Sequence, residues 1–234
     1  MFRELSELIK FTPSDSGAHQ YRSAIIDDNL LGKPTLATRK LTAQRLSELY
    51  GLDPSIPIFR VLRQLWDSDH DGRPMLAFLV AFARDPLLRT TAQAVLTVPL
   101  GRPLTTSDID TMLEERLGTR LNPSVRRKVA RNAGSSWTQS GHLQGRTAKR
   151  RTKPVVTPNS ACLALLLGYA SGLRGRALFA SDWARVLDAS YSELNQLVQA
   201  ANRIGLLNFR QVGDAIEVQF PDLLRPYEEA LCHG

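Results

Sequence analysis

The sequence predicts a mainly α-helical fold with small β-hairpins. Apolar residues recur at helical spacing through most of the chain, and Asp-Pro and Asn-Pro pairs mark helix starts. Two short segments beside turn residues indicate hairpins. The 234 residues and 43% hydrophobic content are enough for two or three small domains with real cores. We expect three segments, at 1–84, 85–158 and 159–234.

The first segment is predicted to be an N-terminal helical domain, a bundle of helices. Residues 2–9 place their apolar side chains on one helical face. A helix near 35–50 is closed by Gly51, and Pro57 opens the next one. Residues 75–83 are apolar almost all round, which predicts a fully buried helix.

Three helices are predicted in the second segment. Asp85 caps the first, which runs over about 86–96. Thr106 or Ser107 caps a short second helix that ends at Gly118. The third begins at Asn122-Pro123 and runs to about residue 140.

A hairpin with a basic tip is expected after the third helix, between residues 143 and 157. A helix, a short helix, a longer helix and a hairpin follow one another in a winged helix-turn-helix. In helix-turn-helix proteins the second helix of the motif lies in the major groove of DNA. The second segment is therefore predicted to be a basic winged-helix module.

The same order of elements recurs in the third segment. An apolar helix at 161–170 is followed by a short helix near 181–187 and by a helix that opens with a Ser190–Glu193 capping box. A Gly-Asp pair at 213–214 supplies the tight turn of a hairpin. We therefore predict tandem winged helix-turn-helix modules after the N-terminal helical bundle.

Charge is divided unevenly along the chain. From Arg116 to Ser181 there are thirteen Arg and Lys and no Asp or Glu, which gives this window +13. The other 168 residues hold 17 basic and 23 acidic side chains, or −6. Because like charges repel, such a field indicates a polyanionic partner, and duplex DNA or RNA is the most common one. A merely solvated basic surface is the alternative.

The third helix of the second segment is the predicted recognition helix. Its inward stripe is expected to be Val125, Val129, Ala133 and Trp137, with Arg127, Arg131 and Ser135 on the opposite surface. Arg and Lys suit guanine edges and phosphates, and Asn and Gln suit adenine edges. The predicted DNA-binding residues on this helix and the wing are Arg126, Arg127, Lys128, Arg131, Asn132, Ser135, Gln139, Arg146, Lys149, Arg150, Arg151 and Lys153.

These basic residues also predict a salt dependence. If the nine cations from Arg126 to Lys153 make six to nine phosphate contacts, the slope of log K against log salt is roughly −5 to −8.

The corresponding helix of the third segment, near 191–204, carries Gln196, Gln199, Asn202 and Arg203 but almost no positive field. We expect this module to pack or bind a protein partner, and a weak role of its amides at base edges stays open. Arg174 and Arg176 either reach backbone phosphates or form a basic helix end.

No catalytic or metal-binding pattern is found in the sequence, so neither an enzyme, a cofactor nor a metal is expected. The histidines are scattered, and none has a carboxylate or cysteine at ligand spacing; they are His19, His70, His142 and His233. His70 lies in an acidic segment that we interpret as a solvated turn. We expect His142 to contact nucleic acid or cap a helix.

The remaining composition suits a cytoplasmic protein. Cys162 and Cys232 are too far apart for a zinc motif and too few for a disulfide framework, which fits a reducing compartment. We expect Cys162 to be a buried thiol. The apolar run at 161–167 is too short to span a bilayer.

The chain resembles the BrxA-like proteins of bacterial BREX phage-defence systems. The resemblance covers about 85–220. It is carried by the helix opening at 85–89 (DPLLR), the run at 125–132 (VRRKVARN) and the run at 135–145 (SSWTQSGHLQG) that leads into the hairpin. It implies a non-enzymatic DNA-binding accessory protein whose partners are double-stranded DNA and other proteins of a multi-component system.

Two other functions fit the same modules. A transcriptional regulator would dimerise on a palindromic site, although the sequence shows no obvious coiled coil or ligand-binding domain for it. A scaffold would use its winged modules to bind protein. RNA binding and homo-oligomerisation stay open, although no aromatic-rich platform for RNA is visible.

Overall fold

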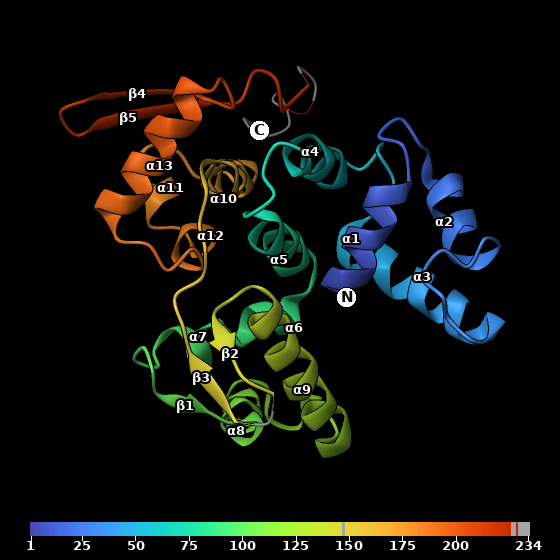
Figure 1. Cartoon of the computed structure of the whole chain (residues 1–234). Helices are drawn as coiled ribbons and strands as arrows, with labels where there is room; N and C mark the ends of the chain where they lie inside the picture. Colours follow the sequence, from blue (N-terminus) through green and yellow to red (C-terminus); the bar gives the residue numbers. More distant parts are fainter. Residues whose placement is uncertain (147, 226–227, 229–234) are drawn as a thin grey trace.

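The computed structural model describes residues 1–146, 148–225 and 228 (Figure 1). Cys232 and His233 lie outside these residues. The protein is mainly helical, with a few short antiparallel strand pairs. Within the described ranges, no helix is long and apolar enough to cross a membrane.

Five helices make up the N-terminal part of the chain: α1 (Phe2–Phe11), α2 (Ala18–Ile26), α3 (Leu36–Tyr50), α4 (Pro57–Trp66) and α5 (Arg73–Arg84). The predicted stripe of α1 is confirmed, because Leu5, Leu8 and Ile9 are buried. Gly51 ends α3 with a φ of 94°, a conformation that favours glycine.

Two apolar helices occupy the centre of the molecule. Every residue from Met75 to Phe82 of α5 is buried, and so is nearly all of α10 (Pro158–Ala170). The two helices pack against each other, and α5 also contacts α3 and α4 (Figure 1). The fully buried helix predicted over 75–83 and the apolar helix predicted over 161–170 are confirmed. The buried residues form one continuous cluster, from Leu5 to Leu224.

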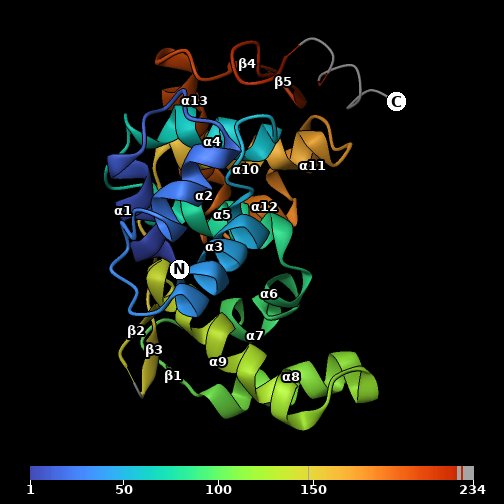
Figure 2. The same ribbon diagram turned by 90° about the vertical axis from the view of Figure 1, so that its right-hand side faces the viewer.

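The middle of the chain forms four α-helices and a small sheet at one end of the molecule, opposite the C-terminal hairpin (Figure 2). The elements are α6 (Pro86–Thr90), α7 (Ala92–Leu96), β1 (Pro103–Leu104), α8 (Thr106–Leu117), a 3-10 turn (Gly118–Arg120), α9 (Pro123–Gln139), β2 (Leu143–Gln144) and β3 (Lys149–Arg151). The single helix expected over 86–96 is instead two helices that meet at Thr91.

The N-caps of α6 and α8 lie at or next to the residues predicted from the sequence. The Asp85 carboxylate accepts hydrogen bonds from the backbone nitrogens of Leu87 and Leu88, as expected of an N-cap. The cap of α8 is Thr105, one residue before the expected position, because Thr105 and Asp108 form a capping box.

The three short strands form one antiparallel sheet in the order β1–β3–β2, with Leu104 opposite Lys149 and Leu143 opposite Arg151. A hairpin, β2 and β3, lies within the predicted range of 143–157, but its second strand is Lys149–Arg151, in the expected basic turn, and residues 153–157 form no strand. The contribution of β1 was not expected from the sequence, in which Pro99 and Pro103 indicate only a break.

The C-terminal part adds α11 (Arg176–Phe179), α12 (Asp182–Arg185), α13 (Tyr191–Arg203), β4 (Asn208–Val212) and β5 (Ala215–Gln219). The predicted Ser190–Glu193 capping box is confirmed at the start of α13. The predicted two-residue turn is confirmed as well, because Val212 pairs with Ala215 and Gly213 has a φ of 56°.

Candidate nucleic-acid interface

Helix α9 is held by its cap and by packing against α8. The Asn122 side chain accepts a hydrogen bond from the Ser124 nitrogen, and Pro123 opens the first turn. The helix contains no Asp or Glu. Figure 1 shows α8 and α9 extending from the rest of the molecule, so one side of α9 faces solvent.

The inward face of α9 follows the expected stripe at Ala133 and Trp137, which are buried, but differs at the start of the helix. Val125 is 46% exposed, and Arg126 is buried in its place. The Arg126 guanidinium contacts the carboxylates of Asp110 at 2.9 Å and Glu114 at 2.8 Å, both on α8. Two ion pairs with α8 therefore fix the rotation of α9. We correct the expectation for Arg126, because its charge is neutralised within the protein.

The outward face of α9 keeps most of its predicted residues. Arg127, Lys128, Arg131, Asn132 and Ser135 are exposed. Arg127 and Arg131 are one turn apart on the same side of the helix. Arg127 Nε donates to the Pro123 oxygen at 3.2 Å, which leaves its terminal nitrogens outward. Among the described residues, no carboxylate forms an ion pair with these three cations.

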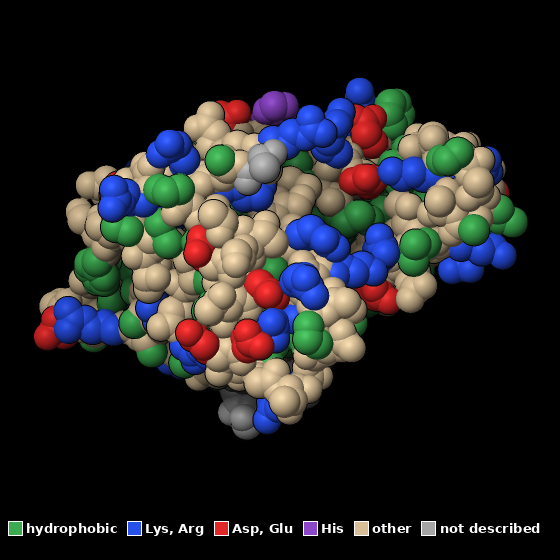
Figure 3. All heavy atoms as spheres, turned by 90° about the horizontal axis from the view of Figure 1, so that it is seen from below, with side chains coloured by type: hydrophobic (Ala, Val, Ile, Leu, Met, Phe, Trp, Pro, Cys, Tyr) green, Lys and Arg blue, Asp and Glu red, His purple; other side chains and the backbone are tan. Residues whose placement is uncertain are grey.

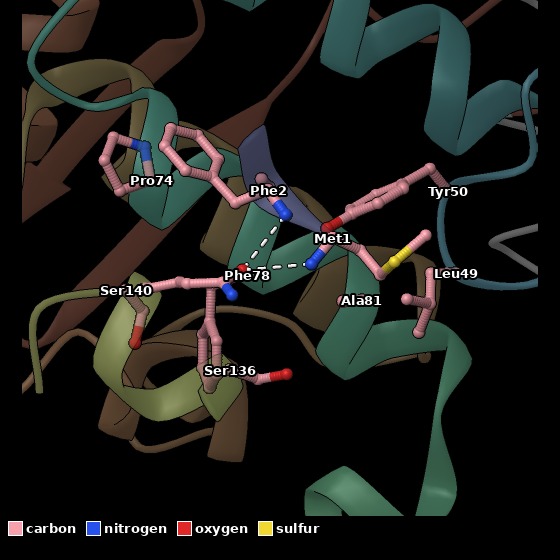
Figure 4. A pocket seen from close by; sticks show the side chains of 11 residues that line it. Met1, Phe2, Leu49, Tyr50, Pro74, Phe78, Ala81, Ser136 and Ser140 are labelled. Carbon is pink, nitrogen blue, oxygen red and sulfur yellow. Dashed lines mark hydrogen bonds between the residues drawn. The ribbon is translucent and has the colours of Figure 1, made fainter. Parts of the chain in front are cut away.

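Gln139 turns toward the first residues of the chain. Its Oε1 accepts hydrogen bonds from the Met1 nitrogen at 3.2 Å and the Phe2 nitrogen at 3.0 Å (Figure 4). The small cavity beside it has a volume of about 20 Å³, room for about one water molecule. Gln139 therefore fixes the end of α9 against α1 and has no free acceptor directed at a base.

Two of the predicted cations of the wing are exposed without a carboxylate partner among the described residues, although Arg150 Nη1 donates to the Gly101 oxygen at 3.1 Å. Arg146 and Arg150 are exposed. Lys149 lies along α9, where its Nζ donates to Thr138 Oγ1 at 2.8 Å. Partial burial lowers the pKa of Lys149.

Arg151 is a buried structural residue. Its Nη2 lies 2.7 Å from the carboxylate of Asp188, and its Nε donates to the Val95 oxygen at 3.1 Å. It also donates to the carbonyl oxygens of His142 and Thr152. We therefore correct the expectation for Arg151, because these contacts join β3 to α7 and to the loop after α12.

Lys153 is paired with a residue of the C-terminal part of the chain. Its Nζ lies 2.6 Å from the Glu193 carboxylate at the start of α13. The Lys153 hydrogen bond, together with those from Ser190, lowers the pKa of Glu193 to about 2. This pair is exposed, but it directs the lysine away from the wing tip.

His142 is not a nucleic-acid contact, contrary to one of our expectations. The side chain is fully buried between Phe78 and Trp137. Its Nε2 donates to the Val186 oxygen at 2.7 Å, so Nδ1 accepts from the Ser140 hydroxyl. Burial lowers the pKa of His142 to about 3, and the ring is neutral at physiological pH.

In the C-terminal part of the chain, the two arginines after α10 have partners within the protein. Arg174 stacks on Tyr169 at 3.6 Å, and Arg176 lies 3.0 Å from Asp214. On α13, Asn202 accepts a hydrogen bond from the Phe209 nitrogen. This helix is therefore braced against its own hairpin, while Gln196 and Arg203 are exposed.

The surface around α9 is basic but mixed. Figure 3 shows Lys and Arg side chains gathered across the middle and right of this face, with Asp and Glu among them. Two exposed arginines near α9, Arg116 and Arg120, lie in the carboxylate-free window but outside the predicted set. Within the described part of the chain, no group of three or more His, Cys, Asp or Glu could hold a metal ion.

The comparisons with known proteins found no matching family model, no similar curated protein and no similar solved structure. The resemblance to BrxA-like proteins stays a hypothesis, and the function has to be argued from the geometry of the chain itself.

Proposed function

We propose that the protein binds double-stranded DNA without catalysing a reaction, and that α9 is its recognition helix. The order of α6 and α7, β1, α8, α9, β2 and β3, with a sheet ordered β1–β3–β2, fits a winged helix-turn-helix. The observation that carries the proposal is the exposed half of α9, where three cations stand without a paired carboxylate beside a hairpin.

Specific roles follow from side-chain chemistry. Arg127 and Arg131 are suited to guanine edges or to phosphates, and Asn132 is suited to adenine. On the wing, Arg146 and Arg150 are suited to the flanking phosphates. Five exposed cations replace the nine counted in the sequence. If each of them contacts one phosphate, the slope of log K against log salt is about −4 to −5.

The C-terminal winged-helix module predicted over 159–234, with α13 and the β4–β5 hairpin, is proposed to bind a protein partner. The β4–β5 hairpin and α9 lie at opposite ends of the molecule in two perpendicular views (Figures 1 and 2). A straight duplex on α9 would therefore leave the hairpin free. On the resemblance alone, we propose that this partner belongs to a phage-defence system of the BREX kind. A transcriptional regulator is the alternative, and a palindromic site bound by a dimer would favour it.

Mobility-shift assays on duplex DNA at several salt concentrations test the proposal. We expect Arg127→Ala/Arg131→Ala to weaken binding and alter any sequence preference, and Arg146→Ala/Arg150→Ala to weaken all sequences alike. Unchanged binding by both variants, or a wild-type slope shallower than about −2, would contradict the proposal and favour a protein-binding scaffold.

Arg126→Ala is the matched control, since Arg126 is adjacent to Arg127 but buried against α8. We expect this variant to have a lower melting temperature. The protein that remains folded is expected to show the wild-type slope of log K against log salt for DNA binding. A slope reduced as much as in Arg127→Ala would mean that Arg126 leaves its partners on binding.

A further inference from the structure

A groove of about 570 Å³ lies beside α9, on the side facing the N-terminal helices. Its walls come from α3, from the junction of α5 and α6, and from α9. Figure 2 shows α3 lying next to the upper end of α9. We propose that this groove holds the sugar–phosphate backbone of one DNA strand, which gives the N-terminal domain a direct part in binding. The inference rests on the proposed function.

The groove lies in the right place around α9. At 100° per residue, the mean direction of Gly134 and Thr138 lies within about 20° of that of Arg127 and Arg131, so these residues share one side of the helix, and Lys128 lies about 80° further round. The wing contacts the C-terminal half of this shared side, because Thr138 accepts a hydrogen bond from Lys149. The Lys128 side lines the groove.

The groove therefore borders the exposed face of α9 on its Lys128 side. A helix in the major groove has a phosphate backbone on each side of it. The groove is placed to meet the backbone on the Lys128 side.

Three cations line the groove. Lys128 lies on the α9 wall, Arg45 is exposed on α3, and Arg84 ends α5. Arg84 is fixed in place, because its Nε donates to the Glu48 oxygen at 2.9 Å and its Nη2 donates to the Ser47 oxygen at 3.3 Å. These bonds cap the C-terminus of α3. Among the described residues, no hydrogen bond engages Nη1 of Arg84, which leaves it available to a phosphate.

The two carboxylates in the groove already have partners. Asp85 accepts from the first turn of α6, and Glu48 accepts from Gln44 at 2.8 Å. The Arg and Lys side chains outnumber them by three to two. Asn132 and Ser135 add neutral donors on the α9 wall, and such mixed cationic and hydroxyl or amide contacts are typical of phosphate recognition.

The test measures binding of a fluorescently labelled duplex by anisotropy at several salt concentrations. Arg45→Ala is expected to weaken binding to all sequences alike and to make the slope of log K against log salt shallower by about 1. Arg45→Glu is expected to weaken it further. The matched control is Arg22→Ala, since Arg22 is exposed on α2 outside the groove and is expected to keep wild-type binding.

A second measurement reports where the DNA lies on the protein and does not depend on binding affinity. An iron–EDTA cleavage reagent attached to Arg45→Cys is expected to cut the DNA backbone, and the same reagent on Arg22→Cys is not. Equal behaviour of the two positions in both assays would overturn the inference.

If Arg127→Ala/Arg131→Ala weakens binding while the Arg45 variants do not, DNA binding by α9 is supported and the role of the groove is contradicted. If the wild-type protein does not bind the duplex, both the proposed function and the role of the groove are contradicted.

Discussion

The indole nitrogen of Trp137 donates a hydrogen bond of 2.8 Å to the Thr91 hydroxyl, and both side chains are fully buried. The same hydroxyl donates to the Leu88 oxygen at 2.7 Å. Thr91 lies where α6 ends and α7 begins. One hydroxyl therefore joins the break between two short helices to the proposed recognition helix.

Replacing Thr91 with valine is expected to lower the free energy of unfolding by about 1–3 kcal/mol, because it leaves a buried indole N–H without an acceptor. Urea unfolding measures the change. Thr90→Val is the control, since that hydroxyl donates only to the Pro86 oxygen at the surface, and its effect is expected within about 0.5 kcal/mol. Equal losses in the two variants would mean that the indole bond is not the cause.

Arg151→Met is expected to destabilise the protein by about 3–5 kcal/mol, since it removes the partner of Asp188 and strips several carbonyl groups of a buried donor. Asp188→Asn is the companion variant, because Asn also tolerates the φ of 54° found there. A double-mutant cycle from urea unfolding should show a coupling of about 0.5–3 kcal/mol. Additive losses would argue that the two side chains act independently.

The buried His142 predicts a dependence of stability on pH. Its pKa is about 3 in the folded protein and about 6.5 when unfolded, so between these values the unfolded chain binds the additional proton. This contribution is fully present above pH about 6.5 and is lost as the pH falls toward 3, by up to about 1.4 kcal/mol per pH unit.

His142→Gln should therefore flatten the fall in stability between pH about 6.5 and 4, as measured by urea unfolding at each pH. His19→Gln, the same change at an exposed site on α2, is expected to keep the wild-type profile. An unchanged profile in His142→Gln would show that another group dominates this pH range.

Gly145 sets the turn of the wing. Its φ is 111°, and an added Cβ would lie 2.2 Å from the Ala148 oxygen, so Gly145→Ala has to displace the turn. We expect DNA affinity to fall at least as far as in Arg146→Ala/Arg150→Ala, with helix content by circular dichroism unchanged. Ala148→Ser, an exposed change in the same turn, should bind normally. Wild-type affinity in Gly145→Ala would show that the conformation of the wing does not contribute to DNA binding.

Local signals in the sequence predicted much of this fold. The caps at Asp85, Asn122 and Ser190 depend on neighbouring residues alone, and the sequence therefore indicates them directly. The all-round apolar character of α5 predicted its burial.

Long-range partners could not be predicted. At the start of α9, Arg126 is bound by Asp110 and Glu114 on α8 and Val125 is left outside, whereas Ala133 and Trp137 are buried as expected. Arg151 lies among the other basic residues of the wing in the sequence, but its partner Asp188 belongs to the C-terminal part of the chain, after α12. The groove cations Arg45 and Arg84 precede the basic window, so charge counting along the chain did not indicate them.

The burial of α10 also bears on how the chain is made. Residues 1–84 alone would leave the side of α5 that packs against α10 open to water. The growing polypeptide must therefore emerge from the ribosome beyond Ala170 before its earlier helices can close their shared interior. Nascent or truncated products that stop sooner would expose apolar surface and depend on chaperones or be degraded.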